Sequence, residues 1–507
     1  MIRRCSSLLA CVVVLPLVAA IPSQERGNAK PRAAGTNHRV VRVTEPDAAG
    51  PVEVSVAVNP TNPDHIVAVS MERGAKKGQA ATTNYAYVST DAGRTWKTAP
   101  HANPDKRTQG DDVVIFAGDG LAVRAYISFL GIRVARPARA VSGIFVTTSR
   151  DGLAWSDPVP VIDHLNSVEP HEDKPWLCAD KSKDSPHRGN IYVAWTKFDV
   201  YSSKKPEHKT HVFFSRSRDQ GKSFSVPHRI SDSPGDCLDS SKTLMGAVPA
   251  VGPKGEVYVV WAGPQGLVLD KSTDGGFTFT TDKIITDTPG GWDFPIKGLG
   301  RCNGLPMLCV DHSPGKDRGT IYVNWADLRH GDPDVFLCAS RDGGATWSKP
   351  LRVNDDPQGN GKEQFFTWMA VDPADGSVNI AFYDRRDLDG TRTGLTLARS
   401  VDGGRTFVNH KINQEPFACT PAAFFGDYLG IDALGGRVVV AYQHFTDCKK
   451  LAISAAVFDF KPGGQEVRAG TEKKQDSITI RPARTMTLDE FRAALAATQS
   501  KWMVVIP

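Results

Sequence analysis

Short apolar segments rich in β-branched and aromatic residues recur along most of the chain, bounded by glycine, proline or aspartate. This composition predicts β-strands. The segments come in pairs joined by a short turn, and the pair occurs seven times. The first members lie at 54–58, 113–117, 176–180, 247–251, 307–311, 368–372 and 429–433. The second members lie at 66–70, 122–128, 191–195, 257–261, 321–325, 378–383 and 438–443. The pattern predicts an all-β chain of repeated units.

A polar motif of the form S-x-D-x-G-x-T-W follows the predicted third strand of six units. A short carboxylate can accept hydrogen bonds from its own turn, and glycine permits a positive φ where the chain reverses. The closing Trp or Phe supplies a large ring that packs between sheets. We therefore assign a structural role to the six box aspartates, which are Asp91, Asp151, Asp219, Asp274, Asp342 and Asp402.

Units of this length with four strands each predict a β-propeller. The seventh unit has a third strand near 451–458 but neither a box nor a fourth strand. Residues 38–47 are similar to the fourth strands of the other units, so we expect them to complete the last sheet and close the ring. The prediction is a propeller over 38–460 with seven four-stranded blades, and six blades are the alternative.

The amino-terminal residues 1–20 have the pattern of a signal peptide. Arg3 and Arg4 precede an apolar run that ends in the small residues Ala19 and Ala20. We therefore expect a protein that is secreted, or periplasmic or extracellular. The next residues, 21–37, are polar and are expected to form a flexible segment.

Residues 461–507 predict a carboxy-terminal α/β tail with a short strand near 477–481 and a helix. Thr487 and Glu490 fit a capping box at the start of that helix. Leu488, Phe491 and Leu495 share one helix face, which we expect to dock on the propeller; binding of a separate partner is the alternative.

The charge balance excludes some classes of partner. The formal net charge is +5 and falls to +3 once Arg3 and Arg4 leave with the signal peptide. A concentrated basic patch, which nucleic-acid binding requires, is missing from the sequence, and no membrane span is expected in the mature chain.

Seven cysteines remain after Cys5 and Cys11 leave with the signal peptide, and an oxidising compartment favours disulfide bonds between them. The loop positions favour pairs of Cys419 with Cys448 and of Cys237 with Cys302, but the sequence does not fix the connectivity, and an odd number leaves at least one cysteine unpaired.

Long loops follow the second and fourth strands, whereas the turns on the box face are short. Long loops on a rigid scaffold commonly carry function, so we expect the site on the face away from the boxes. Acidic pairs in these loops, Asp332 with Asp334 and Asp387 with Asp389, are candidate Ca²⁺ ligands, but neither completes a calcium loop. We therefore expect no obligatory metal or other cofactor, with Ca²⁺ as the alternative.

The boxes and the strands around them resemble the Asp-box repeats of the sialidase superfamily, that is, of bacterial neuraminidases. The resemblance covers about 39–460 and implies a glycosidase with a tyrosine nucleophile, catalytic carboxylates and three arginines that grip a substrate carboxylate. The segment 424–443 is similar to the strand that bears the family's tyrosine, which places Tyr428 at the nucleophile position; the alternative is that Tyr428 packs or forms a hydrogen bond within the central channel. The associated carboxylate candidates are Asp427, Asp384 and Glu172, and the arginine candidates are Arg301, Arg329 and Arg386.

The leading hypothesis is a secreted, sialidase-like glycoside hydrolase that acts on terminal acidic sugars of glycans or glycoconjugates without a metal. The main alternative is a non-catalytic propeller that binds glycan or protein through its long-loop face. A polysaccharide lyase or another hydrolase is a further alternative, because a fold does not fix an activity.

Overall fold

The structure is a computed structural model that describes residues 38–73, 81–100, 103, 107–130, 141–164, 167, 169–447 and 450–460. The predicted signal peptide, the segment 21–37 and the tail 461–507 lie outside the described residues. No helix in this described part is long and apolar enough to cross a membrane.

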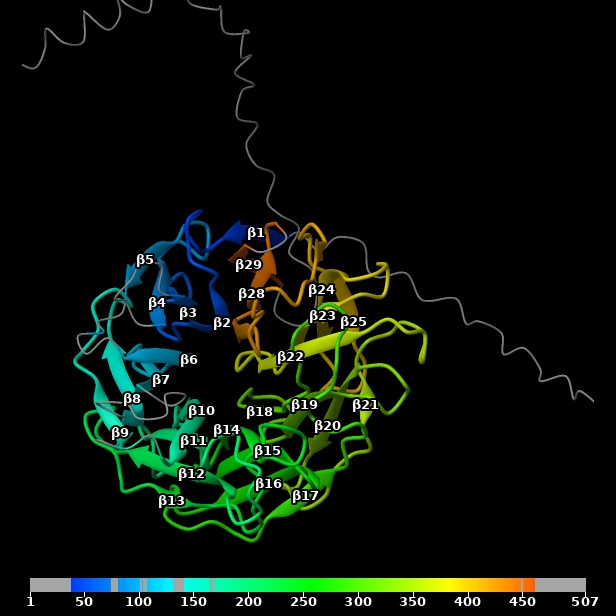
Figure 1. The fold of residues 1–507 in the computed structure, drawn as a ribbon. Helices are drawn as coiled ribbons and strands as arrows, with labels where there is room; N and C mark the ends of the chain where they lie inside the picture. Colours follow the sequence, from blue (N-terminus) through cyan, green and yellow to red (C-terminus); the bar gives the residue numbers. More distant parts are fainter. Residues whose placement is uncertain are drawn as a thin grey trace, which may run out of the picture. The chain divides into compact units, whose positions relative to one another are not determined.

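Seven antiparallel sheets form the seven blades of a propeller, as predicted. In each blade the strands run in order from the inner to the outer edge, and the sixth blade carries one extra short strand. The inner strand of each blade contacts the inner strands of both neighbouring blades, so the ring is closed. Figure 1 shows these inner strands around the centre of the ring.

The first three blades occupy the amino-terminal half of the ring. The first contains β2 (Val52–Val58), β3 (Ile66–Arg73), β4 (Thr82–Ser89) and β5 (Lys97–Pro100). The second contains β6 (Thr108–Phe116), β7 (Ala122–Leu130), β8 (Val141–Ser149) and β9 (Val159–Asp163). The third contains β10 (His171–Ala179), β11 (Ile191–Phe198), β12 (Thr210–Ser217) and β13 (His228–Arg229).

The remaining four blades complete the ring. The fourth contains β14 (Met245–Val251), β15 (Val257–Gly263), β16 (Gly266–Ser272) and β17 (Lys283–Thr286). The fifth contains β18 (Met307–Val310), β19 (Ile321–Asp327), β20 (Asp334–Ser340) and β21 (Leu351–Arg352). The sixth contains β22 (Gln364–Val371), β23 (Val378–Asp384), β24 (Arg392–Ser400), β25 (Val408–Lys411) and the short β26 (Phe417–Ala418). The seventh contains β27 (Gly430–Leu434), β28 (Arg437–Phe445), β29 (Leu451–Asp459) and β1 (His38–Arg42).

The amino-terminal strand closes the ring, as the sequence predicts. Strand β1 pairs with β29 in antiparallel register, with Val40 opposite Ala456. Figure 1 shows β1 in blue beside β29 in orange. This pairing supplies the missing fourth strand of the last blade and joins the two ends of the propeller, so no sheet edge is left between the first and last blades.

Large aromatic side chains at one repeated strand position fill the space between blades. Trp195, Trp261 and Trp325 each stand at the fifth residue of the second strand of their blade, and all three are buried. Burial of such rings is a major source of stability in sheet packing. The repeat in sequence is therefore also a repeat in packing.

Each box aspartate accepts hydrogen bonds within its own turn. In the last box, Asp402 Oδ1 accepts from the Ser400 hydroxyl at 2.7 Å and the Thr406 amide at 3.0 Å, while Oδ2 accepts from the Thr406 hydroxyl at 2.7 Å. Burial is the largest single influence and raises the pKa of Asp402, but the hydrogen bonds together outweigh it and lower the pKa to about 2. The backbone amide bond to Oδ1 recurs in the other five boxes.

Replacing Asp402 by alanine is expected to lower the free energy of unfolding by about 1 kcal/mol, as the loss of a capping carboxylate does elsewhere. Because the folded-state pKa is depressed, the carboxylate stabilises the fold above its unfolded pKa of about 4, and this contribution is lost as the pH falls towards 2. Urea denaturation should therefore show a smaller difference in unfolding free energy between wild type and variant at about pH 3 than at about pH 7. An equal deficit at both values would contradict the ionic role of Asp402.

Candidate functional site on the propeller axis

Five inner strands carry a β-bulge near their first residues, on the face away from the boxes. The register shifts lie between Val52 and Ser55, Gly110 and Val113, Asp173 and Trp176, Met245 and Val248, and Phe365 and Trp368. A residue within each bulge has a positive φ, and these residues are Glu53, Asp111, Lys174, Gly246 and Phe366. Bulges redirect side chains, and strained non-glycine residues gather at functional sites. Here three of the five positions hold charged side chains.

The charged groups at this end of the axis form one electrostatic unit, which we call the axial cluster. Each of its carboxyl groups is influenced by at least one of the two cations of the cluster, or is ion-paired with it. The cluster contains Glu53, Asp111, Asp173, Lys174, Asp239, Arg301 and Asp427. Five carboxyl groups thus face two cations, and the charge of the site depends on how many carboxyls are protonated.

Arg301 lies at the mouth of the axial cluster. Its Nη2 is 2.8 Å from Asp427 Oδ2, and its Nη1 is 3.5 Å from Asp239 Oδ2. The Tyr201 hydroxyl donates to Asp239 Oδ2 at 2.8 Å. The Asn303 amide donates to the Asp427 carbonyl at 3.0 Å, which ties the loop carrying Arg301 to the last blade. The two carboxylates raise the pKa of Arg301, and Asp427 has the larger effect.

Asp111 and Asp173 form a carboxyl pair, because their side chains are hydrogen-bonded to each other. Burial, followed by the charge of Asp173, raises the pKa of Asp111 to about 7. Burial, followed by the charge of Asp239, raises the pKa of Asp173 to about 6. Two neighbouring carboxyls with pKa values near neutrality share a proton over that range, as acid–base catalysts do.

Glu53 is the most deeply buried carboxyl of the cluster, at 3% exposure. Burial raises its pKa well above the usual value, and the charges of Asp111 and Asp427 raise it further. Asp427 is also buried, and burial raises its pKa although Arg301 opposes the shift. The cluster therefore holds protonated carboxyls close to ion-paired ones.

Tyr428 forms an aromatic floor beneath the cluster. Its side chain is 1% exposed, and its ring packs against Trp176 and Trp368 with centroid separations of 5.6 Å. The Tyr428 hydroxyl donates to the Asp112 carbonyl at 3.3 Å, and burial raises the pKa of the phenol. Lys174 Nζ lies 4.0 Å from the centre of the ring. A tyrosine nucleophile needs an accessible oxygen, whereas this hydroxyl points to the backbone below the cluster.

Three buried polar atoms of the cluster have no hydrogen-bond partner among the described residues. They are Nζ of Lys174, a residue that is 6% exposed, Oδ1 of Asp427, which is 8% exposed, and Oδ1 of Asp239. Unpaired polar groups at such depth are costly and are retained mainly where a ligand or water satisfies them. The lysine nitrogen is a donor, and the two carboxyl oxygens are acceptors.

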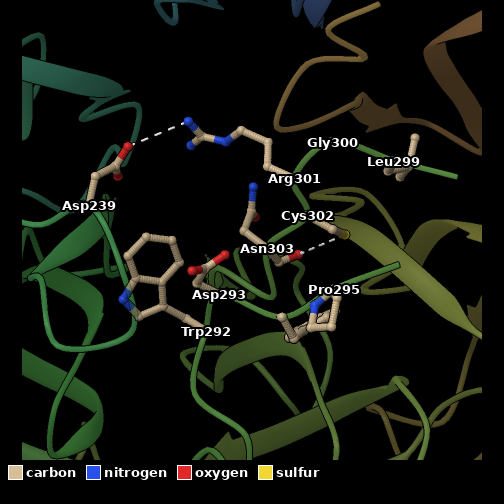
Figure 2. A pocket seen from close by; sticks show the side chains of 10 residues that line it. Asp239, Trp292, Asp293, Pro295, Leu299, Gly300, Arg301, Cys302 and Asn303 are labelled. Carbon is tan, nitrogen blue, oxygen red and sulfur yellow. Dashed lines mark hydrogen bonds and ion pairs between the residues drawn. The ribbon is translucent and has the colours of Figure 1, made fainter. Parts of the chain in front are cut away.

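A cavity of about 400 Å³ opens beside Arg301 and is lined by Asp239, Asp293, Asn303 and the rings of Trp292 and Phe294. Figure 2 shows Arg301 and Asp239 joined by an ion pair, with Trp292 and Asp293 beside them. The volume is within the range of small-molecule sites. The cavity thus brings a charged wall and an apolar wall together next to the axial cluster.

The structure brings together three of the seven predicted site residues outside the boxes: Arg301, Asp427 and Tyr428. It separates the predicted arginine triad. Arg329 is held by Asp327, with Nε at 2.9 Å from Oδ1, and Arg386 is held by Asp384, with Nε at 2.7 Å from Oδ2. These two arginines lock loops of the fifth and sixth blades, because buried carboxylates at the ends of β19 and β23 neutralise them.

The carboxylates Glu172 and Asp384 also lie away from the cluster. Glu172 accepts from Trp195 Nε1 at 2.5 Å and lies 2.7 Å from His164 Nε2. Asp384 is bonded to Arg386 and to the Thr396 hydroxyl, at 2.5 Å. Alternation along β10 sends Glu172 away from the axial side that its neighbour Asp173 faces.

The predicted disulfide between Cys237 and Cys302 is wrong for this structure, in which both are buried free thiols. Cys237 lies in a bridge with Ser203, and the Cys302 thiol faces the Asn303 carbonyl at 3.8 Å. Cys419 is likewise free and lies 3.3 Å from the Thr393 hydroxyl. Its predicted partner Cys448 lies outside the described residues.

The acidic pairs considered for Ca²⁺ have other partners. Asp334 is ion-paired with Arg352 at 2.7 Å, and Asp389 with Lys362 at 2.9 Å. Within the described ranges, no three His, Cys, Asp or Glu side chains are arranged to hold a metal ion.

Sequence reasoning missed Glu53, Asp111, Asp173, Lys174 and Asp239 as members of one site. All of these except Asp239, which lies in the loop before β14, stand within an inner strand, where alternation alone places a side chain in the blade or on the axis. The bulges decide between these positions. A charged residue one or two positions before the apolar run was the available signal.

No protein-family model and no curated protein matches the chain. Among solved structures, a protein of unknown function from Dyadobacter fermentans matches 82% of this chain and 97% of its own, with 15% identity and a TM-score of 0.44. A sialidase from Streptococcus pneumoniae matches 82% and 94%, with 9% identity and a TM-score of 0.44. An α-L-arabinanase from Penicillium chrysogenum matches 83% and 97%, with 12% identity and a TM-score of 0.44. The similarity is one of fold, so the chemistry must be argued from the site.

Proposed function

We propose that the protein is a glycoside hydrolase whose acid–base chemistry is carried by the axial carboxyls, and that it acts outside the cytoplasm, as the amino-terminal pattern indicates. The observation that carries the proposal is the hydrogen-bonded pair of Asp111 and Asp173, with pKa values of about 7 and 6, in the same cluster as the cavity residues Asp239 and Arg301. Glycoside hydrolysis requires one carboxylic acid and one carboxylate near the scissile bond.

In this proposal the carboxyl pair is the general acid. Asp111 holds the shared proton near neutral pH and delivers it to the glycosidic oxygen as the bond to the anomeric carbon breaks. Asp173 accepts the hydrogen bond of that carboxyl and keeps it oriented. Lys174 limits the build-up of negative charge when the proton leaves, since its ammonium lowers the pKa of both groups.

Asp239 is the carboxylate that completes the reaction. It lines the cavity, and two neighbours hold its position, because it accepts a hydrogen bond from the Tyr201 hydroxyl and faces Arg301. There it stabilises positive charge at the anomeric carbon and takes a proton from the attacking water, whose oxygen then bonds to that carbon. One water is consumed, and the acid is restored by the proton that the water gives up.

Two sequence-based expectations are not part of this proposal. A tyrosine nucleophile is not used, because the Tyr428 hydroxyl is buried and bonded to the Asp112 carbonyl. An arginine triad is not used, because Arg329 and Arg386 are ion-paired at other blades.

The test is release of reducing sugar, or of nitrophenol from aryl glycosides, across a panel of glycans. Asp111→Asn and Asp173→Asn are each expected to lower kcat/KM by about a hundredfold or more on a substrate that the wild type cleaves. The wild-type kcat/KM should fall as the pH rises through about 7, because Asp111 then loses its proton.

The matched control is Asp287→Asn. This carboxylate is 79% exposed, precedes the loop of Arg301 and does not line the cavity. Its variant should keep wild-type activity. Full activity of Asp111→Asn, or no product from any glycan tested with the wild type, would refute the proposed function. An unsaturated sugar product would show that the bond is cleaved by elimination and not by hydrolysis, which would also refute the proposed hydrolase.

A further inference from the structure

We infer that the cavity beside Arg301 selects neutral sugars through a pair of adjacent hydroxyl groups, and not acidic sugars. This inference rests on the proposed function and names the substrate class of the same site. It replaces the expectation that arginine binds a sugar carboxylate here.

The first argument is charge. Arg301 is the cation of the cavity wall, and it is already ion-paired with Asp427 and faces Asp239. Asp293 is an additional carboxylate on the same wall, and Arg301 lowers its pKa although burial raises it. An incoming carboxylate would therefore meet one neutralised cation and several acidic oxygens, and like charges in a partly desolvated site repel.

The second argument is the balance of donors and acceptors. Asp239 lines the cavity, and its Oδ1 accepts no hydrogen bond from a described residue. Arg301, at 42% side-chain exposure, still presents N–H groups to the cavity. A cation would leave the donors unsatisfied, and an anion would leave the acceptors unsatisfied. A hydroxyl group both donates and accepts, so two adjacent hydroxyls satisfy both kinds of group.

The third argument is shape. The lining of the cavity also includes the apolar residues Trp292, Phe294 and Pro295. Trp292 is fixed by its indole N–H, which donates to the Thr243 carbonyl at 3.0 Å. A sugar ring has an apolar face of C–H groups and an edge of hydroxyls, which matches a lining of both apolar and polar groups.

The experiment measures equilibrium binding of the full mature chain to an array of purified oligosaccharides at equal density. The array holds neutral, uronic-acid, sialylated and amino-sugar oligosaccharides. We expect binding of one or more neutral oligosaccharides and at least about tenfold weaker binding of uronic and sialylated ones. Arg301→Met should weaken neutral-sugar binding by about tenfold or more, because hydrogen bonds from a charged donor are lost.

Asp293→Asn tests the charge argument without disturbing the buried ion pairs, since Asp293 is exposed. It should raise the affinity for uronic oligosaccharides by a few-fold, and Asp287→Asn should not. Wild-type binding confined to uronic or sialylated sugars would overturn the inference, and so would binding confined to amino sugars. Neutral sugar that binds but is never cleaved would refute the hydrolase and leave this inference standing. Cleavage of acidic sugars alone would support the hydrolase and overturn this inference.

Discussion

The Asp111→Asn variant is expected to unfold at higher denaturant concentration than the wild type at about pH 8, although it has lost most of its activity. Burial raises the pKa of Asp111 from 3.8 to about 7, so the folded protein binds this proton more tightly than the unfolded chain does. The wild type therefore loses stability as the pH rises from about 4 to about 7. Each pKa unit corresponds to about 1.4 kcal/mol, and we expect a gain on the order of 3 kcal/mol in the variant.

Asparagine suits this position in two other respects. It keeps the size of the side chain, and it tolerates the left-handed backbone that Asp111 adopts at φ 45°. The difference between variant and wild type should vanish near pH 4, where Asp111 is protonated in the wild type as well. Chemical denaturation at about pH 4, 6 and 8 measures this directly.

The neighbouring residue is the control, because the same substitution there should have the opposite sign. Asp112 is 0% exposed at its side chain and neutralises the equally buried Arg124. Asp112→Asn leaves that guanidinium without its counter-ion and should destabilise the protein. If both asparagine variants were destabilised at about pH 8, ionised Asp111 would not be destabilising the wild-type protein, and the prediction would be wrong.

A gain in stability with a loss of activity distinguishes a functional carboxyl from a structural one. Glu53 and Asp173, whose pKa values are raised for the same reason, should respond in the same direction. The axial end of the propeller is thus less stable than an uncharged equivalent, as is common where a site must hold reactive groups.

The sequence was sufficient for the architecture because the fold depends on features that repeat. Alternating apolar strands, the box turns and an aromatic residue within the second strand all occur several times, so single irregularities do not obscure them. The closing strand was also predictable, since residues 38–42 have the character of an outer strand and only the last blade lacked one. The signal peptide and the tail stay predictions, because they lie outside the described residues.

The site was predictable only in part. Asp427 and Arg301 lie in loops whose charge draws notice, and the structure places them 2.8 Å apart. Glu53 and Asp111 reach the axis because a bulge inserts one residue and shifts the alternation of the strand. No single-sequence pattern separates that geometry from a regular strand. Conversely, Arg329 and Arg386 resemble binding residues in sequence, and only the positions of Asp327 and Asp384 show that they are already paired.

The largest loss of stability is expected for Arg124→Met. Arg124 Nε donates to Asp112 Oδ1 at 2.7 Å, Nη2 contacts Oδ2, and both side chains are fully buried. Removing the cation leaves a carboxylate in the core, which typically costs 3–5 kcal/mol, or about 4 kcal/mol here. Thermal and chemical denaturation at about pH 8 should show the effect.

The pH dependence of this variant follows from the remaining carboxyl. Burial raises the pKa of Asp112 to about 6 even though Arg124 lowers it, so its pKa must rise further once Arg124 is absent. The variant should therefore recover stability as the pH falls towards 5, because the protonated carboxyl no longer carries a charge. A deficit that is the same at pH 5 and pH 8 would assign the effect to lost packing of the arginine stem.

The double variant Asp112→Leu with Arg124→Met distinguishes the effect of the two charges from the effect of filling the space that they occupy. Replacing both charges by apolar groups of similar size is often neutral, so most of the lost stability should return. Activity should return with it, because Tyr428 contacts the backbone carbonyl of Asp112 and not its side chain. If the double variant folds as stably as the wild type but stays inactive, the pair contributes to catalysis directly. If it is active, the pair serves only to hold the second blade beneath the axial carboxyls.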